Sequence, residues 1–170
     1  MLDILHSFSG VLVNVLTVVT GSILGLVLKK QIPEKLTGAV MTAIGLCTIA
    51  IGVMGIIKGQ NQLVMIISLV LGAVVGTLVD IDGKLQKIGD KLQKKNKGGE
   101  KSTFSQGFVT ASLLFCVGAM TIVGSMNAGI SGDNQMLYTK SVLDLISSTM
   151  LAASLGVGVL ASAVFVLVFQ

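Results

Sequence analysis

The most constraining feature of this chain is a series of five apolar runs, each near or above the length that crosses a bilayer. The hydrocarbon core of a bilayer is about 30 Å thick and takes about 20 helical residues. The runs extend over Phe8 to Leu28, Leu36 to Ile57, Leu63 to Val79, Phe104 to Met126 and Val142 to Phe169. A mean hydropathy of +0.91 is typical of a protein solvated mainly by lipid. The sequence therefore predicts an all-α fold, a polytopic transmembrane helical bundle with five membrane segments.

The distribution of lysine predicts the orientation of these segments. Ten of the twelve Lys residues lie in residues 29–35 and 80–103, which fall on one side of the membrane. The positive-inside bias places that side in the cytoplasm and the N-terminus outside, in a multi-pass protein of the cell (inner) membrane. Because the lysines cluster beside apolar runs, the net charge of +4 is an orientation signal, and we expect no nucleic-acid partner.

Composition divides the chain into three parts. Residues 1–79 form a three-helix membrane unit that we expect to run up, down and up, and residues 104–170 form a second membrane unit with an external polar loop. Residues 80–103 are a basic amphipathic connector. We expect its lysines, from Lys84 to Lys101, to lie on anionic lipid headgroups, because about 1 kcal/mol per lysine explains the composition without any protein partner. Recognition of a partner is the alternative.

Glycines recur four residues apart near the cytoplasmic ends of two runs. Gly21 and Gly25 end the first run, and Gly72 and Gly76 end the third. Small residues at this spacing let transmembrane helices approach closely. We predict close helix packing along both faces, within one chain or between subunits of a homo-oligomer.

The last run is longer than one span requires. Val142 to Phe169 would extend about 42 Å as a straight helix, and Gly156 and Gly158 lie in its middle. We favour a tilted continuous helix with Asp144 in the external interface, because tilt is common. The alternative is a break near Gly156, which would draw Asp144 inward toward an unwound site of the kind that transporters use.

Ionisable and polar side chains in and beside these runs are the candidate functional residues, since such groups at membrane depth are costly. Lys140 and Asp144 lie four residues apart, so they share a helix face and can neutralise one another, or they can form an ion or proton site. Asp133 follows Gly132 and is a turn former or a ligand. The candidates for a solute or ion pathway are Asn14, Thr17, Asn127, Asp133, Lys140, Asp144, Ser147 and Ser148. Hydrogen bonding between helices explains the same side chains without transport.

Signatures of catalysis are missing from the sequence. A single His allows no multi-His metal site in one subunit, and no Walker loop or CxxC motif is present. Cys47 and Cys116 fall in mid-run and are expected to be packed thiols. We expect no enzyme activity, no catalytic residues, no metal and no cofactor.

The C-terminal segment carries a family resemblance. Its GD, KSxLD and LGxGVxxSA elements, with GVLVNVLTVVTGSILG near the N-terminus, resemble the bacterial integral membrane family called domain of unknown function 554 over essentially the whole chain. The resemblance implies the membrane fold class and an important 123–149 segment, but no established activity. Members usually continue with further apolar spans. If Gln170 is a truncation, part of any binding site is missing here.

Two functions from different classes remain. The first is a small membrane transporter or channel, a homo-oligomer in which the polar candidates line a route for an ion or a small polar solute. The second is a membrane scaffold or assembly protein that transports nothing, in which the same groups join helices. Transport requires Asp144 to be reachable from solvent and enclosed by several helices, whereas a packing role requires it to be dry and paired.

Overall fold

The computed structural model describes residues 2–29, 31–59, 61–80, 83–84, 87, 101–116 and 118–170, and its ordered elements are all helices. Most of the basic connector, including the majority of the lysines between Lys84 and Lys101, lies outside the described residues. The helices are α1 (Leu2–Leu28), α2 (Glu34–Lys58), α3 (Gln62–Val79), α5 (Lys101–Cys116), α6 (Ala119–Ser131), α7 (Gln135–Leu155) and α8 (Gly158–Phe169).

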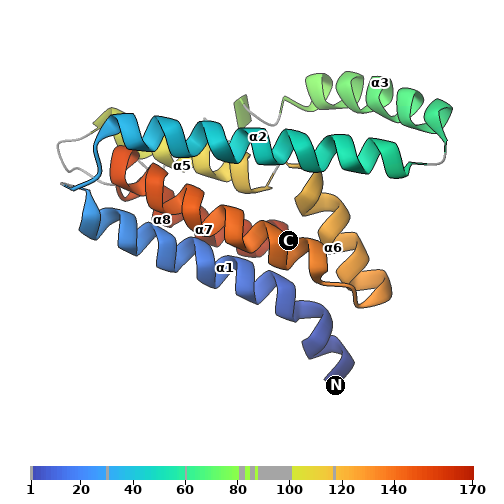
Figure 1. Cartoon of the computed structure of the whole chain (residues 1–170), viewed down its shortest axis with the longest axis horizontal. Helices are drawn as coiled ribbons and strands as arrows, with labels where there is room; N and C mark the ends of the chain where they lie inside the picture. The colour runs from blue at the N-terminus through green and yellow to red at the C-terminus, as the bar shows by residue number, and fades with distance from the viewer. Residues whose placement is uncertain are drawn as a thin grey trace.

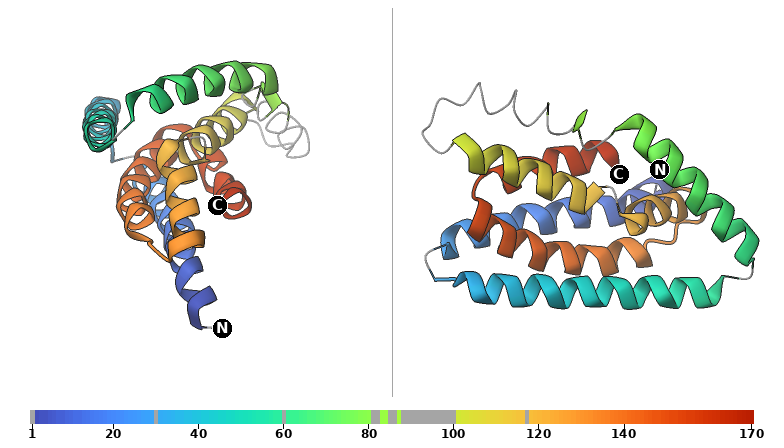
Figure 2. Two further views of the ribbon diagram at one scale, coloured as in Figure 1. Left: turned by 90° about the vertical axis from the view of Figure 1, so that its right-hand side faces the viewer. Right: turned by 90° about the horizontal axis from the view of Figure 1, so that it is seen from above.

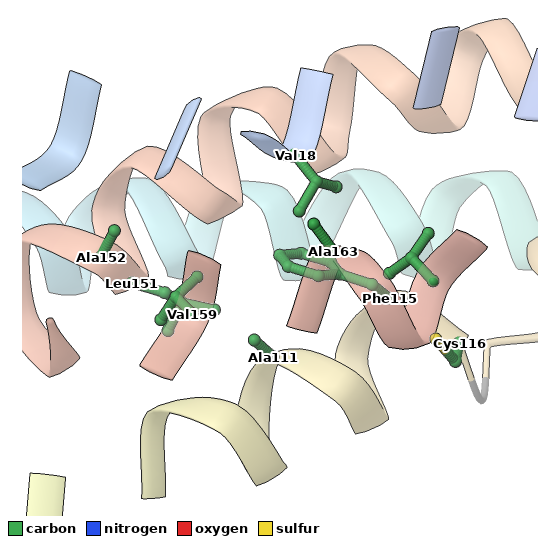
Figure 3. Packing of buried hydrophobic residues seen from close by; sticks show 9 residues of the cluster. Val18, Ala111, Phe115, Cys116, Leu151, Ala152, Val159 and Ala163 are labelled. Atoms are coloured by element: carbon green, nitrogen blue, oxygen red, sulfur yellow. The ribbon is translucent and has the colours of Figure 1, made fainter. Parts of the chain in front are cut away.

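Four helices, α1, α5, α7 and α8, form the core of the molecule (Figure 1). Figure 3 shows Val18 of α1 and Phe115 of α5 among the side chains of α7 and α8 in one buried cluster. Small residues such as Ala152 and Ala163 fill much of this cluster, so the helix backbones lie close together. The described C-terminal half of the chain and α1 therefore make one packed unit.

Helices α1 and α7 lie side by side and run in the same direction. Gly10 near the start of α1 faces Leu137 near the start of α7, and Gly25 near the end of α1 faces Ala152 near the end of α7. Two parallel helices need a connecting segment that returns to the end at which the first helix starts. Here the chain between α1 and α7 makes that return through α2, α3, α5 and α6.

Helices α2 and α3 leave their apolar side chains largely exposed. Helix α2 touches the core along part of α7, and none of its residues is buried. Helix α3 lies crosswise to α2 at the edge of the molecule (Figure 2). The up-down-up arrangement that we expected for residues 1–79 stays a prediction. Both helices are apolar on nearly all sides, so neither has one particular face to bury against the rest of the described chain.

The fourth apolar run is broken in its middle. Helix α5 ends at Cys116, α6 begins after Gly118, and the two are bent by 50°. A break in a helix frees carbonyl groups that need donors. The hydroxyl of Thr121, buried on α6, donates to the Phe115 carbonyl oxygen at 2.9 Å and satisfies one of them.

The fifth apolar run is broken at Gly156, so our preference for a continuous tilted helix is wrong. Gly156 has a φ of +78°, a left-handed conformation that glycine adopts without a Cβ clash. Helix α7 ends before it, and α8 turns back along α1 until Gln170 reaches Asn14. Gly158 lies against the α5 backbone at Phe104 and Phe108, where a side chain would overlap the Phe104 carbonyl oxygen, so glycine lets the returning helix pack this closely.

These breaks change the number of helices that can cross a membrane alone. By length and composition two described helices qualify, at Phe8–Leu28 and Glu34–Lys58, and a third if the bent pair α5 and α6 counts as one span. Leu63–Val79 and Gly158–Phe169 are apolar but shorter. Helix criteria therefore give two or three spans in the described chain, fewer than the five that we expected from the apolar runs.

Candidate functional site

The centre of the candidate site is an ion pair on α7. The ammonium of Lys140 donates to Oδ2 of Asp144, one helical turn further along. Lys140 is 4% exposed and Asp144 is 5% exposed, so the pair is enclosed by protein. The Lys140 ammonium also lies 5.9 Å from the centre of the Phe115 ring on α5, a distance at which a cation is attracted to the ring face.

Two carboxamides from opposite ends of the chain meet beside this pair. Asn14 on α1 is completely buried, and its Nδ2 donates to Oε1 of Gln170 at 3.0 Å. The same Asn14 side chain lies close enough to the Asp144 carboxylate to interact with it electrostatically. The site therefore draws on α1, α7 and the end of α8, with the broken helix α5 on the side of Phe115.

The hydroxyl groups among the pathway candidates bond to their own helices. Thr17 donates to the carbonyl oxygen of Asn14 at 2.8 Å, Ser147 to that of Leu143 at 2.8 Å and Ser148 to that of Leu145 at 3.1 Å. Ser147 and Ser148 are buried on the same helix as the ion pair. Such bonds occupy the hydroxyl hydrogen and leave the oxygen able to accept.

Two other candidates lie away from the pair, at the connection between α6 and α7. Asp133 is exposed, and its Oδ1 accepts from the backbone N–H of Gln135 at 2.9 Å, as in a turn. Asn127 is half-buried near the end of α6, which Gly132 terminates with a φ of +71°. The structure does not bring Asn127 or Asp133 to the Lys140–Asp144 pair.

The two predicted glycine faces have different surroundings. A Cβ on Gly21 would overlap Oγ of Ser148 and lie 2.5 Å from the Leu145 carbonyl oxygen, and one on Gly25 would overlap the Thr149 carbonyl. Gly72 and Gly76 of α3 have no described atom within 4 Å of their Cβ positions. The first face therefore packs on α7, directly beyond the ion pair, and the second has no partner in the described chain.

Sequence reasoning missed several residues of this site. Gln170 and Phe115 gave no signal, because each acts through a contact with a distant helix. Gly10 did have a sequence signal, because small and polar residues recur at helical spacing along α1. These residues, all buried, are Gly10, Asn14, Gly21 and Gly25. This stripe of small and polar residues indicates a helix face that another backbone approaches.

The site is polar and has no net charge. Its two charges cancel, and a lysine ammonium has three donors, of which one is used in a hydrogen bond found in the structure. Among the described residues, no three His, Cys, Asp or Glu side chains come together as metal ligands would. The arrangement is that of a polar site within a helical bundle, with no nucleophile and base in contact.

A family model described as "Protein of unknown function (DUF554)" matches residues 9–170, nearly the entire chain and all of the site. The chain belongs to this family. The family resemblance that we noted in the sequence is thereby confirmed. No solved structure matches the chain significantly.

Two curated relatives are similar along almost the same length of this DUF554 protein. The "Uncharacterized membrane protein YdfK" of Bacillus subtilis (strain 168) is 30% identical over 165 residues, which are 95% of this chain and 69% of the relative. The "Uncharacterized protein YqgA" of Escherichia coli (strain K12) is 28% identical over 165 residues, 95% of this chain and 70% of the relative. The name of the first relative and the apolar helices of this chain both indicate a membrane protein.

Proposed function

We propose that this protein is a small membrane transporter or channel for an ion or a small polar solute. The observation that carries the proposal is the buried Lys140–Asp144 pair, held between α1, α5 and α7 together with Asn14. Charged groups at membrane depth are costly and usually mark a substrate or ion pathway. Asn14 lies six residues into the Phe8–Leu28 span, about 9 Å along the helix, which supports a site inside the hydrocarbon.

The two helix breaks support the same proposal. Transporters build sites near the bilayer midplane from interrupted helices, whose freed backbone groups and unwound segments face the solute. Here α5 ends next to the ion pair at Phe115, and the chain after Gly156 returns to the pair at Gln170. Irregular backbone at membrane depth is tolerated where protein or a cavity surrounds it.

For the topology we propose five membrane-embedded segments with the N-terminus outside the cell (inner) membrane. They are α1, α2, α3, the bent pair α5 and α6, and the hairpin of α7 and α8. In this arrangement α7 crosses from the outside and α8 re-enters from the cytoplasm. The parallel direction of α1 and α7 supports the number of crossings between them, because both helices then start on the same side, and the lysine distribution supports the outside position of the N-terminus.

A scaffold or assembly protein is the second candidate, and one observation favours it. The Lys140–Asp144 pair is dry and paired within the described chain, which is the condition set above for a packing role, whereas transport requires a conformation in which Asp144 is reachable from solvent. The exposed glycine face of α3, at Gly72 and Gly76, is consistent with a homo-oligomer in either case. Flux measurements separate the two candidates.

Replacing Asp144 with Asn should reduce solute flux at least tenfold, because the variant keeps the shape of the side chain and removes its charge. Flux is measured in liposomes over a broad panel of ions and small metabolites. Asp133→Asn is the matched control, since Asp133 is exposed at the α6–α7 turn, and should keep wild-type flux. A wild-type protein that moves nothing in the panel would favour the scaffold.

The topology predicts that cysteines placed at two exposed lysine positions are labelled from opposite sides of the membrane. The test uses a variant in which Cys47 and Cys116 are replaced. Lys35→Cys should react with a membrane-impermeant thiol reagent only from the cytoplasmic side, and Lys58→Cys only from outside. These residues lie at opposite ends of α2, so the pair tests that helix as a span. Labelling from the reversed sides would overturn the orientation, and labelling of both from one side would overturn the span.

A further inference from the structure

The site contains unpaired polar atoms in addition to its ion pair. The Oδ1 atom of Asn14 and the Nε2 atom of Gln170 are buried and have no hydrogen-bond partner. When two carboxamides share one hydrogen bond, one amide oxygen and one amide NH₂ group remain without a partner. This holds whichever way the oxygen and nitrogen of each amide are assigned. An unpaired polar atom in a buried site costs about 1–3 kcal/mol, so these atoms call for a partner that the described residues do not supply.

Charge balance restricts what that partner can be. A simple cation at Asp144 would lie beside the Lys140 ammonium, and a simple anion at Lys140 would face the Asp144 carboxylate. Either would leave one buried charge uncompensated, which is strongly unfavourable. A solute that brings one positive and one negative group can replace the ion pair and keep the site neutral.

Building on the proposed transport site, we infer that the Lys140–Asp144 pair together with Asn14 and Gln170 binds a small zwitterion with an ammonium and a carboxylate, an α-amino acid. The carboxylate of the ligand accepts from Lys140 and from the free amide N–H of Gln170. Its ammonium donates to Asp144 and to the free amide oxygen of Asn14. The donors and acceptors left without partners in the site are thus those that such a ligand would satisfy.

The size of the ligand follows from the packing. Lys140 and Asp144 lie on adjacent turns of α7, about 6 Å apart along the axis, so the two charges of the ligand must be close together. A single carbon separates them in an α-amino acid. Immediately beyond the pair, Gly21 packs against Ser148 and Leu145, so the two helices lie close together on that side of the site.

Ligand binding to the purified full chain tests this inference. The midpoint of thermal unfolding is measured with each of the twenty standard α-amino acids, because a ligand that binds the folded state raises the midpoint. For the strongest one, the matched carboxylate without the amino group and the matched amine without the carboxylate are compared. We expect each analogue to bind at least tenfold more weakly. No shift with any amino acid, or an equal shift with either analogue, would overturn the inference.

Two variants keep the test interpretable. The double variant Lys140→Met with Asp144→Leu removes both charges at once, so it should fold and lose the response to amino acids. Asp133→Asn should keep it. Flux of an ion in liposomes without amino-acid binding would refute the zwitterion and leave the transporter proposal standing. Amino-acid binding without any flux would refute transport and leave the binding site standing.

Discussion

Lys140→Met should lower the free energy of unfolding by about 3–5 kcal/mol. The substitution leaves the Asp144 carboxylate buried with no cation, and breaking a buried ion pair from one side costs about this much. Asn14 remains beside the carboxylate, but an amide does not neutralise a charge. Unfolding is measured in detergent micelles by heat or denaturant, with the wild-type chain as reference.

Removing both charges together should restore most of this loss. In the double variant Lys140→Met with Asp144→Leu, no charge stays buried, and apolar replacements of a buried pair are often neutral or stabilising. The effect of the double variant minus the summed effects of the two single variants, Lys140→Met and Asp144→Leu, measures the coupling of the two side chains. If the double variant is as unstable as the sum of the two single ones, the residues are not coupled in the folded protein.

The ion pair shows which contacts can be predicted from the spacing of residues along one helix. Lys140 and Asp144 are four residues apart on a helix, so the sequence predicts that they share a face, and in the structure they form a pair. The contacts that enclose the pair, from Asn14 and Phe115, depend on how α1 and α5 pack against α7. Spacing within one helix carries no information about those partners, so the enclosure was not predictable.

Helix breaks were harder to predict than helices. The apolar runs that hold α1, α2 and α3 were located from hydropathy alone, because each stays apolar along its length. The stretch from Leu113 to Val123 around Gly118 is apolar apart from Thr121, and glycine is common in membrane helices, so nothing marked the bend between α5 and α6. The run around Gly156 was marked by its excess length, but length alone did not distinguish a tilted helix from a hairpin.

Gly25→Ala should also destabilise the protein, by about 1–3 kcal/mol, although alanine is the better helix former. The added Cβ would overlap the Thr149 carbonyl oxygen and lie 3.0 Å from the Cβ of Ala152, so α1 and α7 would have to separate. Gly21→Ala should act in the same direction, since its Cβ would overlap Oγ of Ser148. The separation would reach the Lys140–Asp144 site, which lies between the same two helices.

Gly72→Ala and Gly76→Ala on α3 are the matched controls, with the same change at the same spacing. No described atom lies within 4 Å of either Cβ position, so the stability of the single chain should stay unchanged or rise by up to about 1 kcal/mol from helix propensity. Thermal unfolding of the four variants in detergent compares the two faces, and size-exclusion chromatography reports the oligomer. Loss of oligomer in the α3 variants alone would assign that face to subunit contacts, whereas equal loss of stability in all four would contradict the packing of α1 on α7 described here.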